Sequence, residues 1–94
     1  MNELGQELRK VREAKNILLR QVSSFLEVDT ALMSKIERGE RNLHRDQVIK
    51  LSEYYNVSQS KLITLWLSDK VLNTLVNEPL AIYGIKNALK KIKK

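Results

Sequence analysis

Apolar residues recur at intervals of three and four along most of the 94-residue chain, and no segment alternates apolar and polar residues over the length of a strand. This interval places apolar side chains on one face of an α-helix, whereas a half-buried strand would need strict alternation. Only three glycines and one proline interrupt the pattern. The sequence therefore predicts an all-α protein.

Helical segments can be placed from this interval and from the residues that begin and end helices. We expect a first helix that ends near residue 16, helices at about residues 19–26, 30–38 and 44–55, and a short fifth helix capped by Ser58. Asp29 can cap the third helix, and Gly39 suits the left-handed position after it. The core-facing positions are Leu4, Leu8, Val11, Val22, Leu26, Met33, Ile36, Val48, Leu51, Tyr55, Leu62, Leu65 and Trp66. Residues 19–38 are thus expected to form a helix, a tight turn and a second helix.

Residues 68–94 depart from this pattern and are expected to form a helical extension to a domain of residues 1–67. Ser68 and Asp69 can cap a sixth helix that continues to Val76, and Pro79 suits an early position in a last helix. The apolar residues here exceed what a five-helix core needs, which favours a homodimer interface; the alternative is that these helices fold back on their own core. The expected interface residues are Trp66, Leu72, Leu75, Val76, Ile82, Ile85 and Leu89.

The net charge of +6 favours a polyanionic partner, but its distribution is uneven. Residues 9–45, which include the expected helix, turn and helix, carry nine basic and five acidic groups and therefore a net charge of +4. Five lysines close the chain: Lys86, Lys90, Lys91, Lys93 and Lys94. This lysine-rich end either aids solubility or reaches nearby phosphates.

Catalytic and metal chemistry finds little support in the composition. The chain has no cysteine and a single histidine, His44, so thiolate metal sites, disulfides and two-histidine sites are excluded. A glycine-rich phosphate loop is missing, and no apolar run approaches the about 20 residues that span a bilayer. We expect a cytoplasmic protein that is not an enzyme, with no cofactor, no metal, no membrane association and no small-molecule ligand.

Three segments carry a resemblance to a known family. They are LGQELRKVR at residues 4–12, SKIERGER at residues 34–41 and LSEYYNV at residues 51–57. Together they resemble the Cro/cI-like, or Xre-like, helix-turn-helix regulators of bacteria and phages over residues 4–66. The resemblance implies a five-helix lambda-repressor-like domain that binds double-stranded DNA as a homodimer on a palindromic operator.

The resemblance also implies which residues meet DNA. The positions that read bases fall on Thr30, Ala31, Ser34 and Lys35. The expected phosphate contacts are Arg20, Arg38, Arg41, Asn42 and Arg45. Leu18 and Leu19 replace the polar pair that usually opens the second helix, and Arg20 is the expected substitute contact. Glu37 is expected to pair with Arg12 rather than to approach phosphates.

Two functions remain open at this stage. The first is a transcriptional regulator that acts by occupying its operator; in size and helical extension the chain is similar to controllers of restriction-modification operons. The alternative is an antitoxin or adaptor that acts mainly through a protein partner bound by the C-terminal helices.

Overall fold

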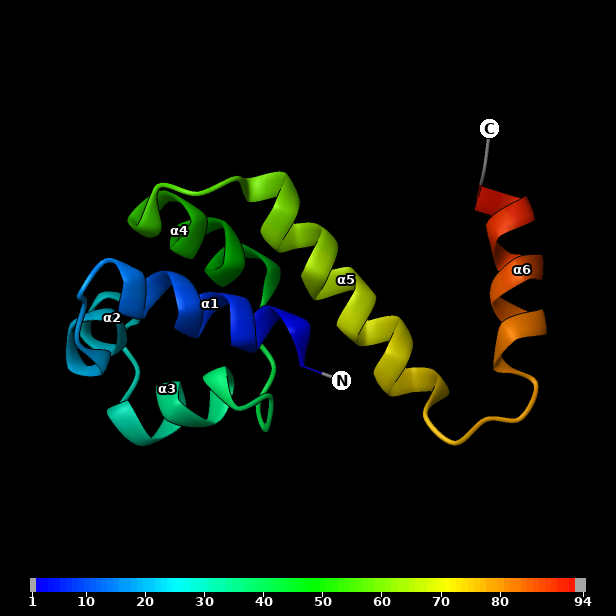
Figure 1. Ribbon diagram of the computed structural model, residues 1–94, viewed down its shortest axis with the longest axis horizontal. Helices are drawn as coiled ribbons and strands as arrows, with labels where there is room; N and C mark the ends of the chain where they lie inside the picture. The colour runs from blue at the N-terminus through cyan, green and yellow to red at the C-terminus, as the bar shows by residue number, and fades with distance from the viewer. Residues whose placement is uncertain (1, 93–94) are drawn as a thin grey trace.

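The computed structural model describes residues 2–92, which contain six helices and no strand. The helices are α1 (Glu3–Ala14), α2 (Leu19–Leu26), α3 (Thr30–Glu37), α4 (Arg45–Tyr55), α5 (Gln59–Leu75) and α6 (Ala81–Ile92). Helices α1 to α4 and the first half of α5 pack together, the second half of α5 projects from them, and α6 stands apart at the far end (Figure 1). Lys93 and Lys94, the last of the predicted lysine-rich end, lie outside the described residues.

The core is formed by side chains from all five helices, α1 to α5. Most of them are the residues that the helical interval placed inward. Its buried apolar side chains are Leu4, Leu8, Val22, Leu26, Met33, Ile36, Leu43, Val48, Leu51, Tyr55, Leu62 and Ile63. The pattern predicted all of them except Leu43 and Ile63. Val11, Leu65 and Trp66, also predicted inward, are half-buried against this core.

Helix ends follow the local chemistry of their residues. The side chains of Asn2, Asp29 and Ser58 each accept a hydrogen bond from a backbone N–H in the first turn of the next helix. Asn56 ends α4 in the left-handed conformation, at φ 56°, as expected for a residue type that tolerates it. These caps fix where the helices of the body begin and end.

The predicted break at Ser68 and Asp69 is wrong, because α5 continues from Gln59 to Leu75 without interruption. The carboxylate of Asp69 caps α1 instead: Oδ1 accepts from the Glu3 N–H and Oδ2 from the Leu4 N–H, both at 3.0 Å. The first N–H groups of a helix lack partners within that helix, so this contact stabilises the start of α1. The predicted boundary between residues 67 and 68 therefore falls inside α5.

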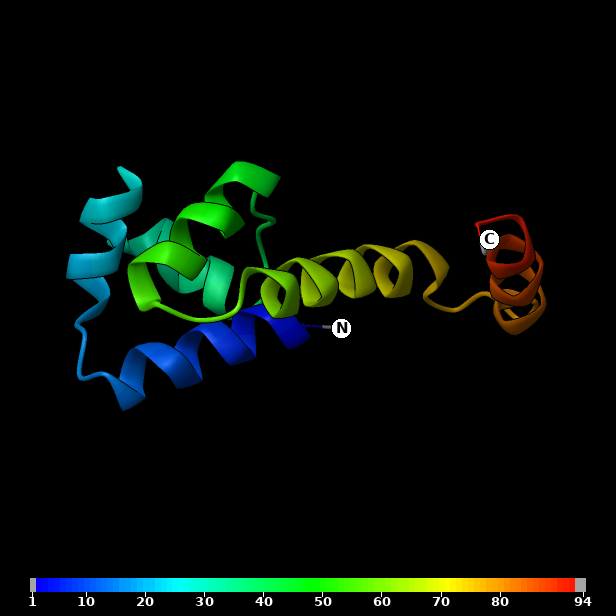
Figure 2. The same ribbon diagram turned by 90° about the horizontal axis from the view of Figure 1, so that it is seen from above.

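A segment at residues 76–80 separates α5 from α6. Pro79 lies in this segment, two residues before α6 begins, rather than inside the last helix. None of the residues of Ala81–Ile92 is buried, so α6 does not fold back on the core in the single chain. Figure 1 shows α6 upright beyond the end of α5, and Figure 2 shows the same helix nearly end-on. Within residues 2–92, no helix combines the length and apolarity that crossing a membrane requires.

Candidate nucleic-acid interface

A short turn joins α2 to α3 and sets the angle between them. Glu27 adopts the left-handed conformation at φ 60° and ends α2, and the Val28 N–H donates to the Ser23 carbonyl oxygen at 3.0 Å. Asp29 Oδ1 then accepts from the Leu32 N–H at 2.6 Å and begins α3. The two helices and the three residues between them reproduce the arrangement predicted for residues 19–38.

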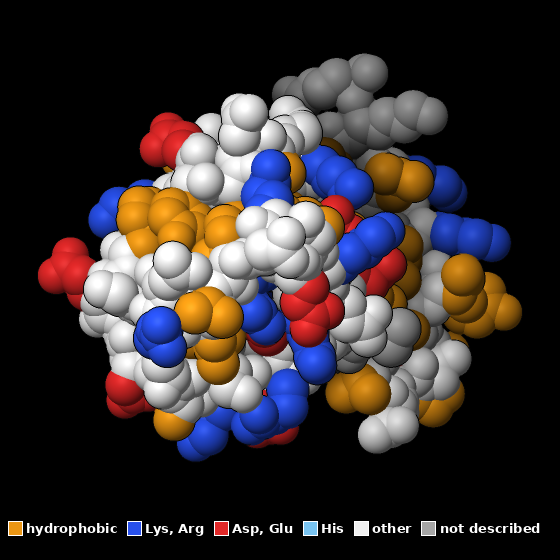
Figure 3. Space-filling view, turned by 60° about the vertical axis from the view of Figure 1, so that its left-hand side comes forward, with side chains coloured by type: hydrophobic (Ala, Val, Ile, Leu, Met, Phe, Trp, Pro, Cys, Tyr) orange, Lys and Arg blue, Asp and Glu red, His pale blue; other side chains and the backbone are white. Residues whose placement is uncertain are grey.

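Burial of one face of α3 decides which face is presented outward. Met33 and Ile36 are buried in the core, so the opposite side of the helix faces solvent. Of the predicted base-reading residues, Thr30, Ala31 and Lys35 are exposed, and Ser34 is half-buried. In Figure 3, Lys and Arg side chains are spread over the face that is shown, and several of them lie in its lower part. The structure therefore offers a braced, outward-facing helix in basic surroundings.

A family model described as a helix-turn-helix domain matches residues 3–63, about two thirds of the chain. The chain belongs to the helix-turn-helix domain family. Comparison with curated proteins and with solved structures gave no match. The match spans all of α1 to α4, including the α2–turn–α3 unit, and supports a DNA-binding regulator.

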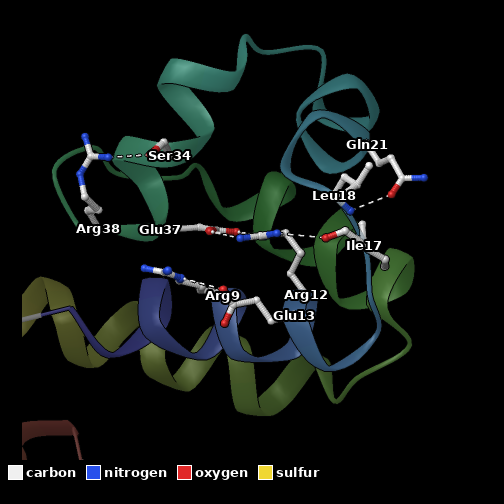
Figure 4. A network of polar contacts seen from close by, with 9 residues as sticks. All are labelled: Arg9, Arg12, Glu13, Ile17, Leu18, Gln21, Ser34, Glu37 and Arg38. Carbon is white, nitrogen blue, oxygen red and sulfur yellow. Dashed lines mark hydrogen bonds and ion pairs between the residues drawn. The ribbon is translucent and has the colours of Figure 1, made fainter.

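Arg38 lies at the end of the second helix of the helix-turn-helix and bonds two neighbours. Its Nη1 donates to Ser34 Oγ at 2.6 Å (Figure 4), and its Nε and Nη2 donate to the Glu40 carboxylate at 2.9 and 3.3 Å. The hydrogen bonds between Arg38 and Glu40, with the attraction of their opposite charges, raise the pKa of Arg38 and lower the pKa of Glu40. The structure thus joins a predicted base-reading residue to a predicted phosphate contact, and adds a carboxylate beside them that the sequence patterns did not single out.

The remaining predicted phosphate contacts lie on both sides of α3 in the chain. Arg20 is exposed near the start of α2, Arg41 and Asn42 are exposed in the loop after α3, and Arg45 is the exposed first residue of α4. This places α3 of the helix-turn-helix between basic residues that precede it and basic residues that follow it.

The N-termini of α2 and α4 have related geometry. Gln21 Oε1 accepts from the Leu18 N–H at 2.7 Å (Figure 4), and Gln47 Oε1 accepts from the His44 N–H at 2.8 Å. Neither Leu18 nor His44 caps its helix through a side-chain hydrogen bond in the described structure. Backbone N–H groups of both first turns can therefore donate to an anion, as helix N-termini commonly do. Leu18 itself is 49% exposed.

Arg12 and Glu37 form a buried ion pair that ties α1 to α3 (Figure 4). Arg12 Nε donates to Glu37 Oε2 at 2.8 Å and Nη2 donates to Oε1 at 3.1 Å, while Nη1 donates to the Ile17 carbonyl oxygen at 3.0 Å. The two side chains are 13% and 5% exposed. The hydrogen bond to Glu37 raises the pKa of Arg12. Glu37 thus points toward α1 and away from the outward face of α3.

A close approach between α1 and the end of α3 went undetected in the sequence. The Asn2 side chain accepts from the Gly5 N–H and donates to the Glu37 carbonyl oxygen, both at 3.1 Å. A Cβ atom at Gly5 would lie 2.6 Å from that same carbonyl oxygen, so a larger residue would push the two helices apart. The Leu4-Gly5 pair of the family resemblance was the available signal for this contact.

Trp66 joins α5 to the loop that follows α3. Trp66 Nε1 donates to the Leu43 carbonyl oxygen at 2.9 Å, and the Lys70 ammonium lies 4.5 Å from the centre of the indole ring. A cleft of about 350 Å³ beside them is lined also by Arg41 and Asn42. Trp66, predicted at the base of a dimer interface, is thus packed on its own chain, and Lys70 adds a basic group near the loop.

The other residues predicted at a dimer interface lie away from the core. Leu72 and Leu75 are half-buried on α5. The exposed ones are Val76 at 66%, Ile82 at 56%, Ile85 at 38% and Leu89 at 57%. The predicted DNA contacts belong to other elements: α2, α3, the loop after α3 and the first residue of α4.

Proposed function

We propose that this chain is a sequence-specific transcriptional regulator that binds a palindromic operator as a homodimer. The observation that carries the proposal is the outward face of α3, held by α2 within a matched helix-turn-helix domain. A helix braced in this way fits the major groove, which is about 12 Å wide. Two copies related by a two-fold axis would then read two half-sites one helical turn apart.

The side chains on α3 define a limited set of base contacts. Lys35 supplies the strong donor for the O6 and N7 atoms of guanine, while Thr30 and Ala31 supply methyl groups that pack on thymine. Ser34 reads through its hydroxyl group, which already accepts from Arg38. Arg20, Arg41, Asn42 and Arg45 position the domain on phosphates, which fixes its register on the duplex. Arg38 adds a further phosphate contact.

We place the protein among the Cro/cI-like, or Xre-like, regulators and propose that it controls a restriction-modification operon. The motif SKIERGER and the short helical extension after the matched domain support this assignment. On this proposal the protein regulates by occupying its promoter.

Selection of bound sites from a random DNA pool, followed by gel shifts over a salt series, tests the proposal. We expect one enriched palindromic sequence and an affinity that falls with salt at a slope of about 0.9 per neutralised phosphate. A flat salt response, or equal affinity for the selected site and random duplex, would contradict it.

A second candidate is an antitoxin or adaptor that acts through a protein partner. The exposed apolar face of α6 favours this alternative, because such a face is costly to leave in water. The two candidates differ in the DNA experiment: an adaptor would show weak binding without sequence preference, since charge alone would attract it to DNA.

A further inference from the structure

Exposed apolar side chains are concentrated at one end of the molecule. Of the eleven large apolar side chains exposed in residues 2–92, nine lie between residues 67 and 92, with exposed fractions from 38% to 72%. In Figure 3, orange and blue side chains share the right-hand side of the view. Contiguous exposed apolar surface on a small protein commonly marks an interaction site.

Helix α5 has two apolar rows. Leu62 and Ile63 are buried in the core, and the row that begins at Ile63 continues at intervals of four, beyond the core, through Leu67, Val71 and Leu75. Leu67 and Val71 are 47% and 46% exposed, and Leu75 is half-buried. Residues four apart lie one above the other on a helix, so these three form a continuous row, here named the outward strip of α5.

Helix α6 has one apolar face and one basic face. Ile82, Ile85, Leu89 and Ile92 recur at the helical interval and define the apolar face of α6. Between them the helix carries three lysines and no acidic residue: Lys86, Lys90 and Lys91. An amphipathic helix without a buried residue needs a partner surface to become a stable element.

The two surfaces do not cover each other within one chain. Every residue of α6 remains unburied, and residues 76–80 lead the helix away from α5 (Figures 1 and 2). Both surfaces are therefore available to a second molecule.

We propose that the homodimer forms by exchange: the apolar face of α6 of each copy packs on the outward strip of α5 of the other copy. This inference rests on the homodimer of the proposed function. Two-fold symmetry makes the exchange reciprocal, so both surfaces of both copies become covered in one closed assembly.

Charge favours this pairing over contact between two copies of α6. An α6–α6 contact would bring the lysines of both helices together and oppose association by repulsion. The outward strip of α5 is bordered on one side by a carboxylate, because Ser68 Oγ donates to Glu3 Oε2 at 3.4 Å, and on the other side by Lys70, which lies over the ring of Trp66. Glu78, exposed in the connecting segment, adds a second carboxylate. The lysines of an incoming α6 thus meet carboxylates at the edge of the strip.

The centre of a dimer interface is richer in apolar atoms than its rim. Exchange covers the row on α5 and the face of α6 on each copy, and therefore uses most of the nine exposed side chains.

A complementation experiment with full-length chains tests the exchange. Val71→Glu places a negative charge on the outward strip of α5, and Ile85→Lys places a positive charge on the apolar face of α6. Both positions are exposed, so folding is expected to be preserved. Each variant alone should sediment as a monomer where the unmodified chain is a dimer. An equimolar mixture should recover dimers, because the introduced carboxylate of one copy then meets the introduced ammonium group of the other while the second interface is unaltered.

Matched controls place the same charges elsewhere on the two helices. Gln59→Glu lies at the start of α5 and Asn87→Lys on the polar side of α6, and both residues are exposed. Neither substitution should convert the sedimenting dimer into a monomer. A mixture of Val71→Glu and Ile85→Lys that stays monomeric would overturn the exchange, as would dimerisation that Val71→Glu leaves intact.

Disulfide trapping gives an independent readout, because the chain contains no cysteine of its own. Oxidation of a mixture of Val71→Cys and Ile85→Cys chains should give more covalent dimer than either variant alone. As much covalent dimer from Ile85→Cys alone as from the mixture would indicate α6–α6 contact. An intrachain bond in a chain that carries both Val71→Cys and Ile85→Cys would indicate folding back. Both results contradict exchange.

The two proposals fail in different ways. If the protein is a monomer that binds a selected DNA site, the proposed exchange is wrong and sequence-specific DNA binding stands. If the two variants recover dimers when mixed but the protein prefers no DNA sequence, the exchange stands and the proposed regulator is wrong.

Discussion

Residues 2–66 and residues 67–92 use apolar side chains in opposite ways. Counting Ala, Val, Ile, Leu, Met, Phe, Trp and Tyr, the second region is the more apolar, with 13 of 26 residues against 26 of 65 in the first. Yet all twelve buried apolar side chains of the core belong to the first region, and no residue of the second is buried. Apolar content therefore does not determine burial; the presence of an opposing surface does.

The same contrast extends to polar groups. In the first region, polar groups pair with other groups of the same region. Examples are the buried ion pair, three side-chain helix caps and the hydrogen bond from the Asn2 side chain to the Glu37 carbonyl oxygen. In the second region Asp69 contacts the first region by capping α1, and Ser68 Oγ donates to Glu3 Oε2. The first region thus folds on itself, whereas the second carries surfaces suited to another molecule.

The largest expected effect is the loss of the buried ion pair. Arg12→Ala leaves the Glu37 carboxylate buried without its partner, which should lower the free energy of unfolding by about 3 to 5 kcal/mol in urea denaturation. Arg9→Ala is the matched control on the same helix. Its pair with Glu13 is 61% and 56% exposed, so the loss should stay below about 1 kcal/mol. Equal losses for the two variants would contradict a special role for the buried pair.

Leucine truncation compares the two regions directly. Leu51→Ala removes a fully buried side chain from the core and should cost about 2 to 5 kcal/mol of unfolding free energy. Leu89→Ala truncates a side chain that is 57% exposed on α6, and should change the stability of the monomer by less than about 0.5 kcal/mol. Unfolding measured over a series of protein concentrations separates a change in the stability of the monomer from a weaker dimer. A large loss for Leu89→Ala in the monomer would mean that α6 packs on its own chain.

Asp69 tests the connection between the regions. Asp69→Ala removes both acceptors at the start of α1 and should cost about 1 to 2 kcal/mol in thermal or urea unfolding. Asp69→Asn retains one carbonyl oxygen and should lose about half as much. If both variants unfold like the unmodified chain, α5 is not anchored to α1 through this carboxylate.

The exposed pair of Arg38 and Glu40 should affect DNA binding rather than folding. Glu40→Gln removes a negative charge beside the expected phosphate contacts and should tighten binding by about two- to fivefold in gel shifts. Unfolding should be unchanged. Weaker binding by Glu40→Gln would indicate instead that the carboxylate holds Arg38 in the geometry that DNA requires.

Sequence periodicity predicted the helices of the body because burial there follows a single stripe on each helix. Leu43 escaped it because it lies in a loop, and Ile63 because α5 has more than one apolar side. Asp69 was assigned to its own helix because a local cap and a contact with residues 3 and 4 look identical in sequence.

In the candidate site, too, some features could be predicted from the helical interval and others could not. The outward position of Thr30, Ala31 and Lys35 follows from the burial of Met33 and Ile36, so it was predictable from the helical interval. The contacts of Arg38 with Ser34 and Glu40 depend on the chain path after α3, which periodicity does not describe. Family resemblance supplied the partner of Arg12, which no local pattern contains.

The central claim, that α3 reads base sequence, is tested most directly by Lys35→Ala on two DNA duplexes measured side by side. One duplex carries the site selected from a random pool, and the other has the same length and a scrambled sequence. Because Lys35 is exposed, its truncation should leave the fold intact. We predict that binding to the selected site weakens by about 1 to 3 kcal/mol while binding to the scrambled duplex changes much less. Equal weakening on both duplexes would contradict base reading by Lys35 and make it a phosphate contact.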